Sequence, residues 1–289
     1  MKICIVTGAN TGIGLAIAES LAEQGQGVVM VCRDEARGLA ALERVRARAA
    51  AGATVELVRG DLGTIASSER AAKAIADACP RIDVLIHNAG LWPTERHLNE
   101  EGFERAFAVN HLAPFVLGQR LLPVLRRTEG ARIVQVTAGL YVKGSVDLER
   151  TPTGEDFGMM RTYASTKLWN LLATLELSRR EADEGPCVLA VHPGVVRTGL
   201  GEHGHWAVPL VRLVKRLWIT PEQGARGPVR AALDPSLDDQ TGTYYDQLER
   251  AKLTAVATDR ALAQQVWAHT EALVAAARRG EADGGAGPR

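Results

Sequence analysis

The sequence lacks two features that would point to a membrane protein or to a nucleic-acid-binding protein. No apolar run reaches the roughly 18 residues that a membrane-spanning helix needs, although hydrophobic residues make up 46% of the 289-residue chain and suffice for a sizeable core. Neither charge sign is in excess, because 34 lysines and arginines balance 34 acidic residues. No global field therefore draws the chain to nucleic acid or to an anionic membrane. We expect a globular protein without a membrane span, whose partner is a small molecule.

Cysteine is also scarce, and the four cysteines stand far apart at Cys4, Cys32, Cys79 and Cys187. They form no C-x-x-C pair and have no histidine at metal-ligand spacing beside them, so we predict buried free thiols and no metal site. The strand-forming run Lys2-Ile3-Cys4-Ile5-Val6 follows the first residue at once, which leaves no room for a secretory signal. We therefore expect a reducing, cytoplasmic location.

Short runs rich in β-branched residues alternate with longer stretches rich in Ala, Leu, Glu and Arg. The predicted strands cover residues 3–6, 27–31, 55–58, 84–86, 132–136 and 187–191. The predicted helices cover about 13–23, 35–50, 65–78, 100–125 and 162–180. The strand runs are apolar without alternation, as in parallel strands that helices cover on both faces. The order predicts an α/β fold, a Rossmann-type doubly wound parallel sheet of about seven strands.

We predict a single domain over residues 1–279, because the sequence contains no internal repeat and no interdomain linker. Two long gaps between periodic segments, at about 138–160 and 198–220, follow strand ends, where open α/β sheets bind their ligands. We expect them to be substrate loops. Residues 280–289 have nothing to bury, and we expect a disordered tail there.

A glycine-rich turn, Thr7-Gly8-Ala9-Asn10-Thr11-Gly12-Ile13-Gly14, follows the first predicted strand and precedes a predicted helix. Glycines in this position let the backbone approach a pyrophosphate, whose charge meets the N–H groups of the helix start. The spacing Gly-x-x-x-Gly-x-Gly departs from the commoner Gly-x-Gly-x-x-Gly, and a merely structural turn is the alternative. Its context favours a dinucleotide site.

Arg33 bears on the choice of dinucleotide. The second strand should deliver the residue that faces the ribose 2′ position, about 20 residues beyond the glycines, which falls on Cys32 and Arg33. A guanidinium can bind a 2′-phosphate through charge-assisted bonds, whereas an acid would accept a bond from a free 2′-hydroxyl. We therefore predict NADP(H) rather than NAD(H), although Asp34 either caps the next helix or weakens the phosphate site.

Tyr163 and Lys167 are four residues apart in a predicted helix, which places both side chains on one face. A phenol with a pKa near 10 is a poor acid or base at neutral pH, and a neighbouring ammonium group can lower that pKa. A tyrosine and a lysine at this spacing occur often by chance, so the pair indicates a catalytic site only in combination with the other motifs.

In their order and spacing, these motifs resemble the short-chain dehydrogenase/reductase family over roughly residues 1–245. The retinol-dehydrogenase-like branch is the most similar. Besides the glycine turn and the Tyr163–Lys167 pair, the segments that carry the resemblance are Val31-Cys32-Arg33-Asp34, Asp61-Leu62, His87-Asn88-Ala89-Gly90, Val109-Asn110-His111-Leu112, Pro193-Gly194-Val195-Val196-Arg197-Thr198 and Thr241-Gly242-Thr243-Tyr244-Tyr245.

The resemblance implies a cofactor site in which Asp61 and Leu62 hold the adenine while Val196 and Thr198 fix the carboxamide. It also implies a homo-oligomer, since relatives often dimerise through the helices that here carry Asn110 and Tyr163. The implied cofactor-binding residues are Gly8, Asn10, Thr11, Gly12, Ile13, Gly14, Arg33, Asp61, Leu62, Asn88, Ala89, Gly90, Tyr163, Lys167, Pro193, Val196 and Thr198.

The resemblance further implies three catalytic residues. Tyr163 would be the general acid, Lys167 would bind the nicotinamide ribose and tune the tyrosine, and Asn110 would hold a water that relays protons to Lys167. Taken singly, such residues have structural alternatives, since Asn110 can be a tolerated polar residue of its helix. His87, His111 and His192 flank these motifs, and we expect structural roles for them.

Ala138 occupies the position where the family normally has a serine that bonds the substrate oxygen, 25 residues before Tyr163. The neighbouring Thr137 should face the other side of the strand unless a bulge turns it, and Ser145 is a more distant candidate. Losing one oxyanion donor typically costs about 2.7–4 kcal/mol. Three explanations stay open: a substrate that positions itself or is an imine, another residue in the serine's role, or loss of redox chemistry.

The leading hypothesis is an NADPH-dependent reductase that acts on a carbonyl or imine of a largely apolar small molecule, with Tyr163 as proton donor. The alternatives are a cyclase or dehydratase that uses Tyr163 for proton transfer alone, and a cofactor-binding regulatory protein without turnover. The apolar character of the substrate is inferred from residues near the strand-end loops: Leu91, Trp92, Leu140, Trp206, Val208 and Leu210.

Overall fold

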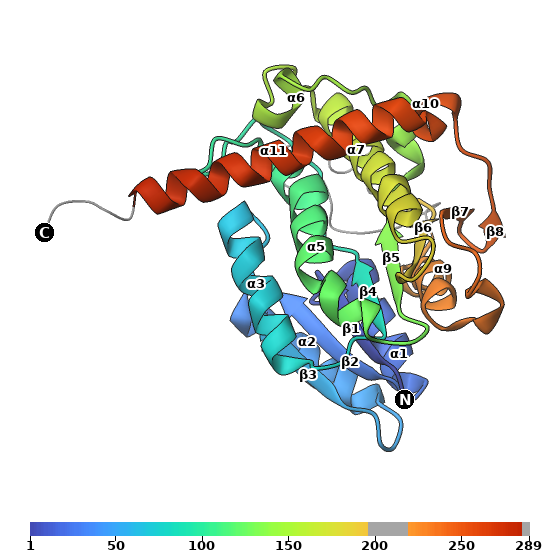
Figure 1. The fold of residues 1–289 in the computed structure, drawn as a ribbon. Helices are drawn as coiled ribbons and strands as arrows, with labels where there is room; N and C mark the ends of the chain where they lie inside the picture. The colour runs from blue at the N-terminus through green and yellow to red at the C-terminus, as the bar shows by residue number, and fades with distance from the viewer. Residues whose placement is uncertain (196–218, 285–289) are drawn as a thin grey trace, which may run out of the picture.

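The computed structural model describes residues 1–195 and 219–284, and it consists of one twisted sheet between two layers of helices (Figure 1). The eight strands follow the order β3-β2-β1-β4-β5-β6-β7-β8, and all neighbours are parallel except β7 and β8. Their bounds are β1 Ile3–Thr7, β2 Gly27–Cys32, β3 Val55–Arg59, β4 Val84–His87, β5 Arg132–Val136, β6 Cys187–His192, β7 Thr243–Asp246 and β8 Glu249–Arg250. This confirms the predicted Rossmann-type fold.

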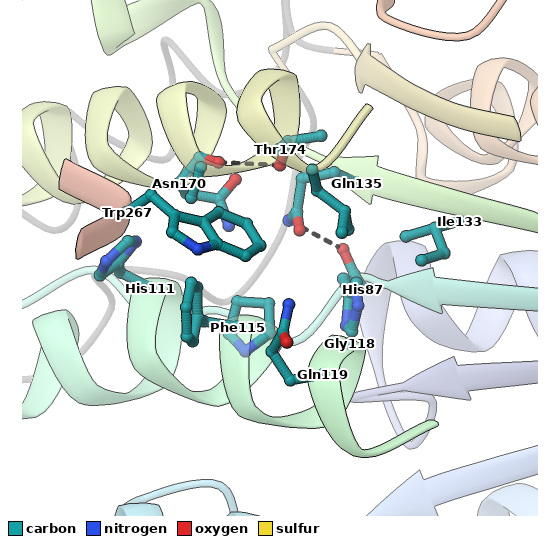
Figure 2. Close-up of a pocket in the computed structure, with 13 residues that line it drawn as sticks. His87, His111, Phe115, Gly118, Gln119, Ile133, Gln135, Asn170, Thr174 and Trp267 are labelled. Atoms are coloured by element: carbon teal, nitrogen blue, oxygen red, sulfur yellow. Dashed lines mark hydrogen bonds between the residues drawn. The ribbon is translucent and has the colours of Figure 1, made fainter. Parts of the chain in front are cut away.

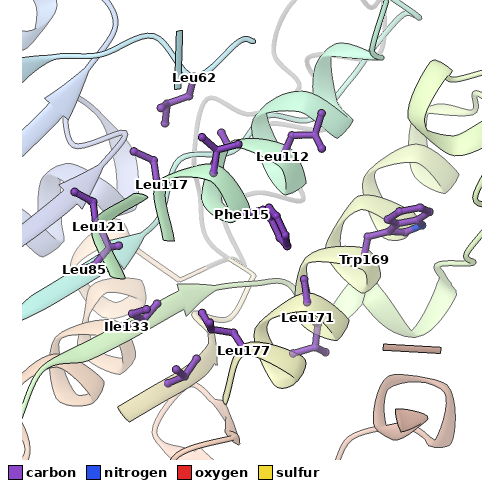
Figure 3. Packing of buried hydrophobic residues seen from close by; sticks show 14 of the residues in the cluster. Leu62, Leu85, Leu112, Phe115, Leu117, Leu121, Ile133, Trp169, Leu171 and Leu177 are labelled. Atoms are coloured by element: carbon purple, nitrogen blue, oxygen red, sulfur yellow. The ribbon is translucent and has the colours of Figure 1, made fainter. Parts of the chain in front are cut away.

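Helices cover both faces of the sheet, as predicted. One apolar cluster joins a face of the sheet to α1, α2 and α9, and a second joins the other face to α3, α5 and α7. Figure 3 shows part of this second cluster, which includes Phe115 of α5, Trp169 of α7 and the strand residue Ile133. The bounds are α1 Gly12–Glu23, α2 Glu35–Arg48, α3 Ile65–Ala78, α5 Ala113–Arg126, α7 Met159–Arg180 and α9 Pro221–Leu233.

The helix expected over 100–125 begins later and is interrupted. Its pieces are α4 Arg105–Phe107, a π-helical turn Ala108–Leu112 and α5. The residues before it form a capping loop instead, because the Asn99 side chain accepts bonds from the backbone N–H groups of Glu101 and Phe103 at 3.0 and 2.9 Å. The Glu101 carboxylate then accepts two bonds from the first turn of α3.

A long C-terminal helix, α11 Arg260–Gly284, was not predicted, and it crosses α7 and α5 on their outer side (Figure 1). Trp267 packs on Phe115 with ring centroids 4.8 Å apart, and a buried bond of 2.9 Å joins His111 Nε2 to Thr270 Oγ1. The helix continues through 280–284, which we expected to be disordered, because extending a helix adds one hydrogen bond for each residue fixed. None of the described helices is long and apolar enough to cross a membrane.

The segment 138–160, expected to be a loop, contains short helical turns at Gly139–Lys143 and at α6 Arg150–Thr153 before α7 begins. Most of the second expected loop, 198–220, lies outside the described residues. One further short helix, α10 Ala255–Thr258, leads into α11.

Candidate active site

The predicted site residues meet at the carboxyl ends of the strands. The strand order reverses between β1 and β4, and the chain leaves these two neighbours toward α1 on one side and α5 on the other. A crevice forms outside the strand ends at such a switch point in open α/β sheets, and ligands bind there. The turn after β1, the loop after β4 and the first half of α7 all reach this edge (Figure 1).

The glycine turn brings its own backbone segments into close contact. Gly8 has a φ of +67°, and a Cβ on Gly14 would lie 2.3 Å from the Gly8 carbonyl oxygen and 2.4 Å from Asn88 Nδ2. Thr11 begins α1 without a side-chain cap, and the first turn contains no acidic residue. The N–H groups of this first turn and the helix dipole are therefore suited to binding an anion. These features fit the diphosphate of a dinucleotide.

Thr7 holds this turn against the loop after β4. Its hydroxyl accepts bonds of 3.0 Å from the backbone N–H groups of both Asn88 and Ala89, and Asn88 Nδ2 donates to the Thr7 carbonyl at 2.9 Å. Sequence reasoning missed Thr7, although a buried hydroxyl at the end of an apolar strand is a signal that could have found it. Asn88 thus joins the two segments of the predicted cofactor channel.

The ends of β2 and β3 carry the residues expected at the adenosine end of the cofactor. Arg33 is exposed directly after β2, whereas the Asp34 carboxylate accepts the Arg37 N–H at 2.9 Å and caps α2. Asp61 is exposed and accepts the Gly63 N–H at 3.2 Å, and Leu62 is buried. Asp34 therefore serves as the helix cap, which was one of the two roles considered for it.

Tyr163 and Lys167 lie one turn apart on α7, with Lys167 Nζ 5.8 Å from the centroid of the tyrosine ring. Lys167 Nζ also donates to the Val136 carbonyl oxygen at 3.4 Å. Burial raises the pKa of Tyr163 to about 12 and lowers the pKa of Lys167 to about 8. The phenol is thus protonated at neutral pH, and the ammonium form predominates below about pH 8.

Asn110 connects the loop after β4 to α7. Its Oδ1 accepts the Leu91 N–H at 2.8 Å, and its Nδ2 donates to the Leu91 carbonyl and to Thr166 Oγ1, both at 3.0 Å. Thr166 in turn donates to the Tyr163 carbonyl at 2.8 Å. Asn110 is 1% exposed, and both polar atoms of its side chain are hydrogen-bonded. Sequence reasoning found Asn110 but missed Thr166.

Ala138 is half-buried and extended, with φ −144° and ψ 141°, just beyond β5. The Thr137 N–H continues the regular pairing to the Val191 carbonyl at 2.9 Å, so no bulge turns Thr137 toward the side of Ala138. The Thr137 hydroxyl is buried and finds no partner within the described part of the chain. Ser145 is exposed, and only its backbone N–H bonds to α7, at Ser165.

His87 and His111 are buried, and burial lowers the pKa of each to about 3, so both rings are neutral. They line a cavity between α5, α7 and the sheet together with Gln135, Asn170 and Trp267 (Figure 2). Tyr163, Lys167 and Ala138 do not line it, so this cavity is separate from the predicted catalytic residues. In residues 1–195 and 219–284, no group of three or more potential ligands could hold a metal ion.

Two of the expected nicotinamide contacts, Val196 and Thr198, lie outside the described residues. Pro193 is buried after β6, and Gly194 follows with a φ of +90°. His192 lies beside Gly139, so closely that a Cβ on Gly139 would be 3.2 Å from His192 Nε2. Burial lowers the pKa of His192.

This fold and site define a nicotinamide-type α/β oxidoreductase, and the chain belongs to the short chain dehydrogenase family, whose model matches residues 2–205. Retinol dehydrogenase 14 of Mus musculus is 35% identical over 286 residues, which cover 94% of this chain and 86% of that relative. The retinol-dehydrogenase-like resemblance is thereby confirmed.

Two solved structures show the same fold. A protein of Mycobacterium paratuberculosis has a TM-score of 0.75 and 29% identity, covering 95% of this chain and 93% of that one. A short chain dehydrogenase of Burkholderia cenocepacia, solved in complex with NADP, has a TM-score of 0.67 and 24% identity, covering 85% and 95% of the two chains.

Proposed function

We propose that the protein is an NADPH-dependent reductase of a carbonyl or imine group in a largely apolar small molecule, with Tyr163 as the proton donor. The observation that carries this proposal is the fully bonded Asn110, which ties the loop after β4 to the helix of Tyr163 and Lys167. Burying polar groups costs free energy unless each is bonded. An arrangement that fixes these three residues relative to one another favours turnover over a purely structural or regulatory role.

The residues present fit a dinucleotide. Gly14 packs so closely on Gly8 and Asn88 that a side chain there would collide with them, which matches the close packing of helix on strand in dinucleotide sites, and the exposed Arg33 follows β2, where we expect a 2′-phosphate. NADP(H) is favoured over NAD(H) because Asp34, the nearest acid, is engaged as a helix cap. The complex of the Burkholderia cenocepacia protein with NADP gives an example of such binding in this fold.

When bound, the nicotinamide supplies a hydride to the substrate carbon and is itself oxidised. Tyr163 donates the proton that the reduced oxygen or nitrogen requires, so the product is an alcohol or an amine and the phenolate regains its proton from solvent. Lys167, as an ammonium group 5.8 Å from the ring centroid, stabilises that phenolate. The high pKa of Tyr163, about 12, keeps the proton available at neutral pH.

Exposed apolar side chains near the carboxyl ends of the strands support an apolar substrate; they are Val142, Met159, Met160 and Val195.

We also propose a reducing, cytoplasmic location, which is supported by four unpaired cysteines, three of them buried. A homo-oligomer remains part of the proposal. Its interface would avoid the outer side of α7, which α11 covers.

The test is NADPH oxidation, followed by absorbance, with a panel of ketones, aldehydes and imines. The Tyr163→Phe variant should lose at least about 10²-fold in kcat, while NADPH binding, followed by fluorescence, should persist. If the wild-type protein binds NADPH tightly but oxidises none with the panel, the reductase proposal fails. The cyclase, dehydratase and regulatory alternatives would then take its place.

A further inference from the structure

Trp92 packs against the ring of Tyr163. The two ring centroids are 4.4 Å apart, and the ring planes are inclined by 33°. Trp92 belongs to the loop after β4, whereas Tyr163 belongs to α7, so this contact joins two segments distant in sequence. Aromatic rings at this separation attract one another beyond the effect of burial. One side of the Tyr163 ring is therefore covered by an indole.

The chain on either side of Trp92 is fixed. Asn110 bonds both backbone groups of Leu91, the preceding residue, and the following residue is the buried Pro93, whose ring restricts its φ. Asn110 is also bonded to Thr166 on α7, next to Lys167. The backbone that carries Trp92 and the helix turn that carries Tyr163 are thus both linked to Asn110, and the indole is held against the phenol by the ring contact itself.

We propose that Trp92 is a specificity-determining residue, a wall beside Tyr163 that restricts the substrate to carbonyl compounds with at least one slender group on the carbonyl carbon. The inference rests on the proposed reductase function. A carbonyl oxygen must come within hydrogen-bond reach of the phenol to take its proton. Groups that branch beside that carbonyl would then collide with a rigid, flat and apolar side chain.

The first test compares acetophenone with tert-butyl phenyl ketone, which differ only in the bulk of one substituent. The wild-type protein should favour acetophenone, and Trp92→Ala should reduce the ratio of the two kcat/KM values by at least about tenfold. The matched variant Trp92→Phe keeps an aromatic wall, although it loses the indole N–H and part of the ring area, so its ratio should stay within about threefold of wild type. An unchanged ratio in Trp92→Ala overturns the proposal. So does a Trp92→Phe variant that behaves like Trp92→Ala, because an aromatic ring at this position would then not set the selectivity.

The second test does not need turnover. The phenol of Tyr163 is titrated by ultraviolet absorbance in each Trp92 variant, and the same variant carrying Tyr163→Phe is subtracted as the blank. Burial raises the pKa of Tyr163 to about 12, so removing the indole in Trp92→Ala should lower that pKa, whereas Trp92→Phe should leave it near the wild-type value. An unchanged midpoint in Trp92→Ala means that Trp92 does not cover Tyr163 and overturns the proposal. If wild type reduces neither ketone, the reductase function fails on its own, and this titration still decides the position of Trp92.

Discussion

Asn170 Nδ2 donates a hydrogen bond to the backbone carbonyl of Asn110 at 3.1 Å. This carbonyl is free to accept it because residue 114, four positions further along, is a proline. In an α-helix that carbonyl would accept the N–H of residue 114, but Pro114 has none. The Ala113 N–H instead bonds the Ala108 carbonyl, which makes the π-helical turn. The turn and Asn170 together allow the Asn110 side chain to reach Leu91 and Thr166.

Replacing Asn170 by Ala should destabilise the protein by about 1–3 kcal/mol, because a buried carbonyl loses its partner. It should also lower kcat, since the π-helical turn positions Asn110. Urea unfolding and NADPH oxidation measure the two effects. The matched control is Thr174→Val, which removes a buried hydroxyl bonded to the Asn170 carbonyl one turn away and leaves Asn110 untouched. Equal losses of kcat in both variants would contradict a specific role for Asn170.

Lys167 should make folding stability depend on pH. Burial lowers the pKa of Lys167 from 10.5 to about 8. Between these values the unfolded chain keeps a proton that the folded chain has released, so the free energy of unfolding should rise with pH over this window, relative to a Lys167→Met variant. Below about pH 8 the buried ammonium destabilises the fold. Urea unfolding of both proteins without cofactor measures this difference.

The comparison with Lys167→Met removes other titrations in the same window. Burial raises the pKa of Cys4 to about 12, which lowers stability at alkaline pH, but it does so equally in both proteins. A difference in unfolding free energy that stays constant from pH 7 to pH 10.5 would show that Lys167 is not buried as an ionisable group.

The sequence alone predicted the central strands well because β1, β2, β4, β5 and β6 are short, apolar and almost entirely buried. The predicted strand over 132–136 coincides with β5, and that over 27–31 is one residue shorter than β2. The helix α11 was missed because Trp267 and its neighbours pack on α5 and α7, so their burial depends on the assembled fold. The π-helical turn was missed although Pro114 is a visible signal of a lost backbone bond.

The motifs predicted the candidate catalytic residues, but not the contacts that connect them. Asn110 is 19 residues from Leu91 and 56 from Thr166, and nothing in local pattern brings these groups together. Trp92 appeared in the sequence only as one apolar residue near a strand end. Its stacking on Tyr163 depends on how the loop after β4 meets α7.

Arg33→Ala should weaken NADPH binding by about tenfold and leave NADH binding unchanged, because a charge-assisted bond to the 2′-phosphate is lost. Fluorescence titration of both cofactors measures the change. Arg127→Ala, an exposed arginine at the end of α5 on the opposite edge of the sheet, is the control for a general loss of charge. A similar loss for both cofactors with Arg33→Ala would remove the argument for NADP(H).

The cavity lined by His87, His111 and Asn170 should hold ordered water. Within the described residues, His87 Nδ1, His111 Nδ1 and Asn170 Oδ1 are buried without partners. About 30 Å³ of the cavity is open to the centres of water molecules, and one water needs roughly 10–15 Å³ on this measure. A high-resolution crystal structure should show about two waters bonded to these atoms. A dry cavity would mean that these polar groups find other partners or other rotamers.

Ala138→Ser tests whether the site is complete except for one hydroxyl. Ala138 has an extended backbone that serine adopts without strain, and it is half-buried rather than tightly packed. If the added hydroxyl bonds the substrate oxygen beside Tyr163, kcat/KM for a simple ketone should rise by up to about 10²–10³-fold. The matched variant Thr137→Ser keeps a hydroxyl on the opposite face of the strand and should leave kcat/KM unchanged. The double variant Ala138→Ser with Tyr163→Phe should be inactive.

A ketone reductase that gains nothing from Ala138→Ser already has another donor in the serine's place. A protein that reduces an imine but no ketone, with or without the serine, has no oxyanion to stabilise, and in that case Ala138 reflects the chemistry of the substrate rather than a loss of function.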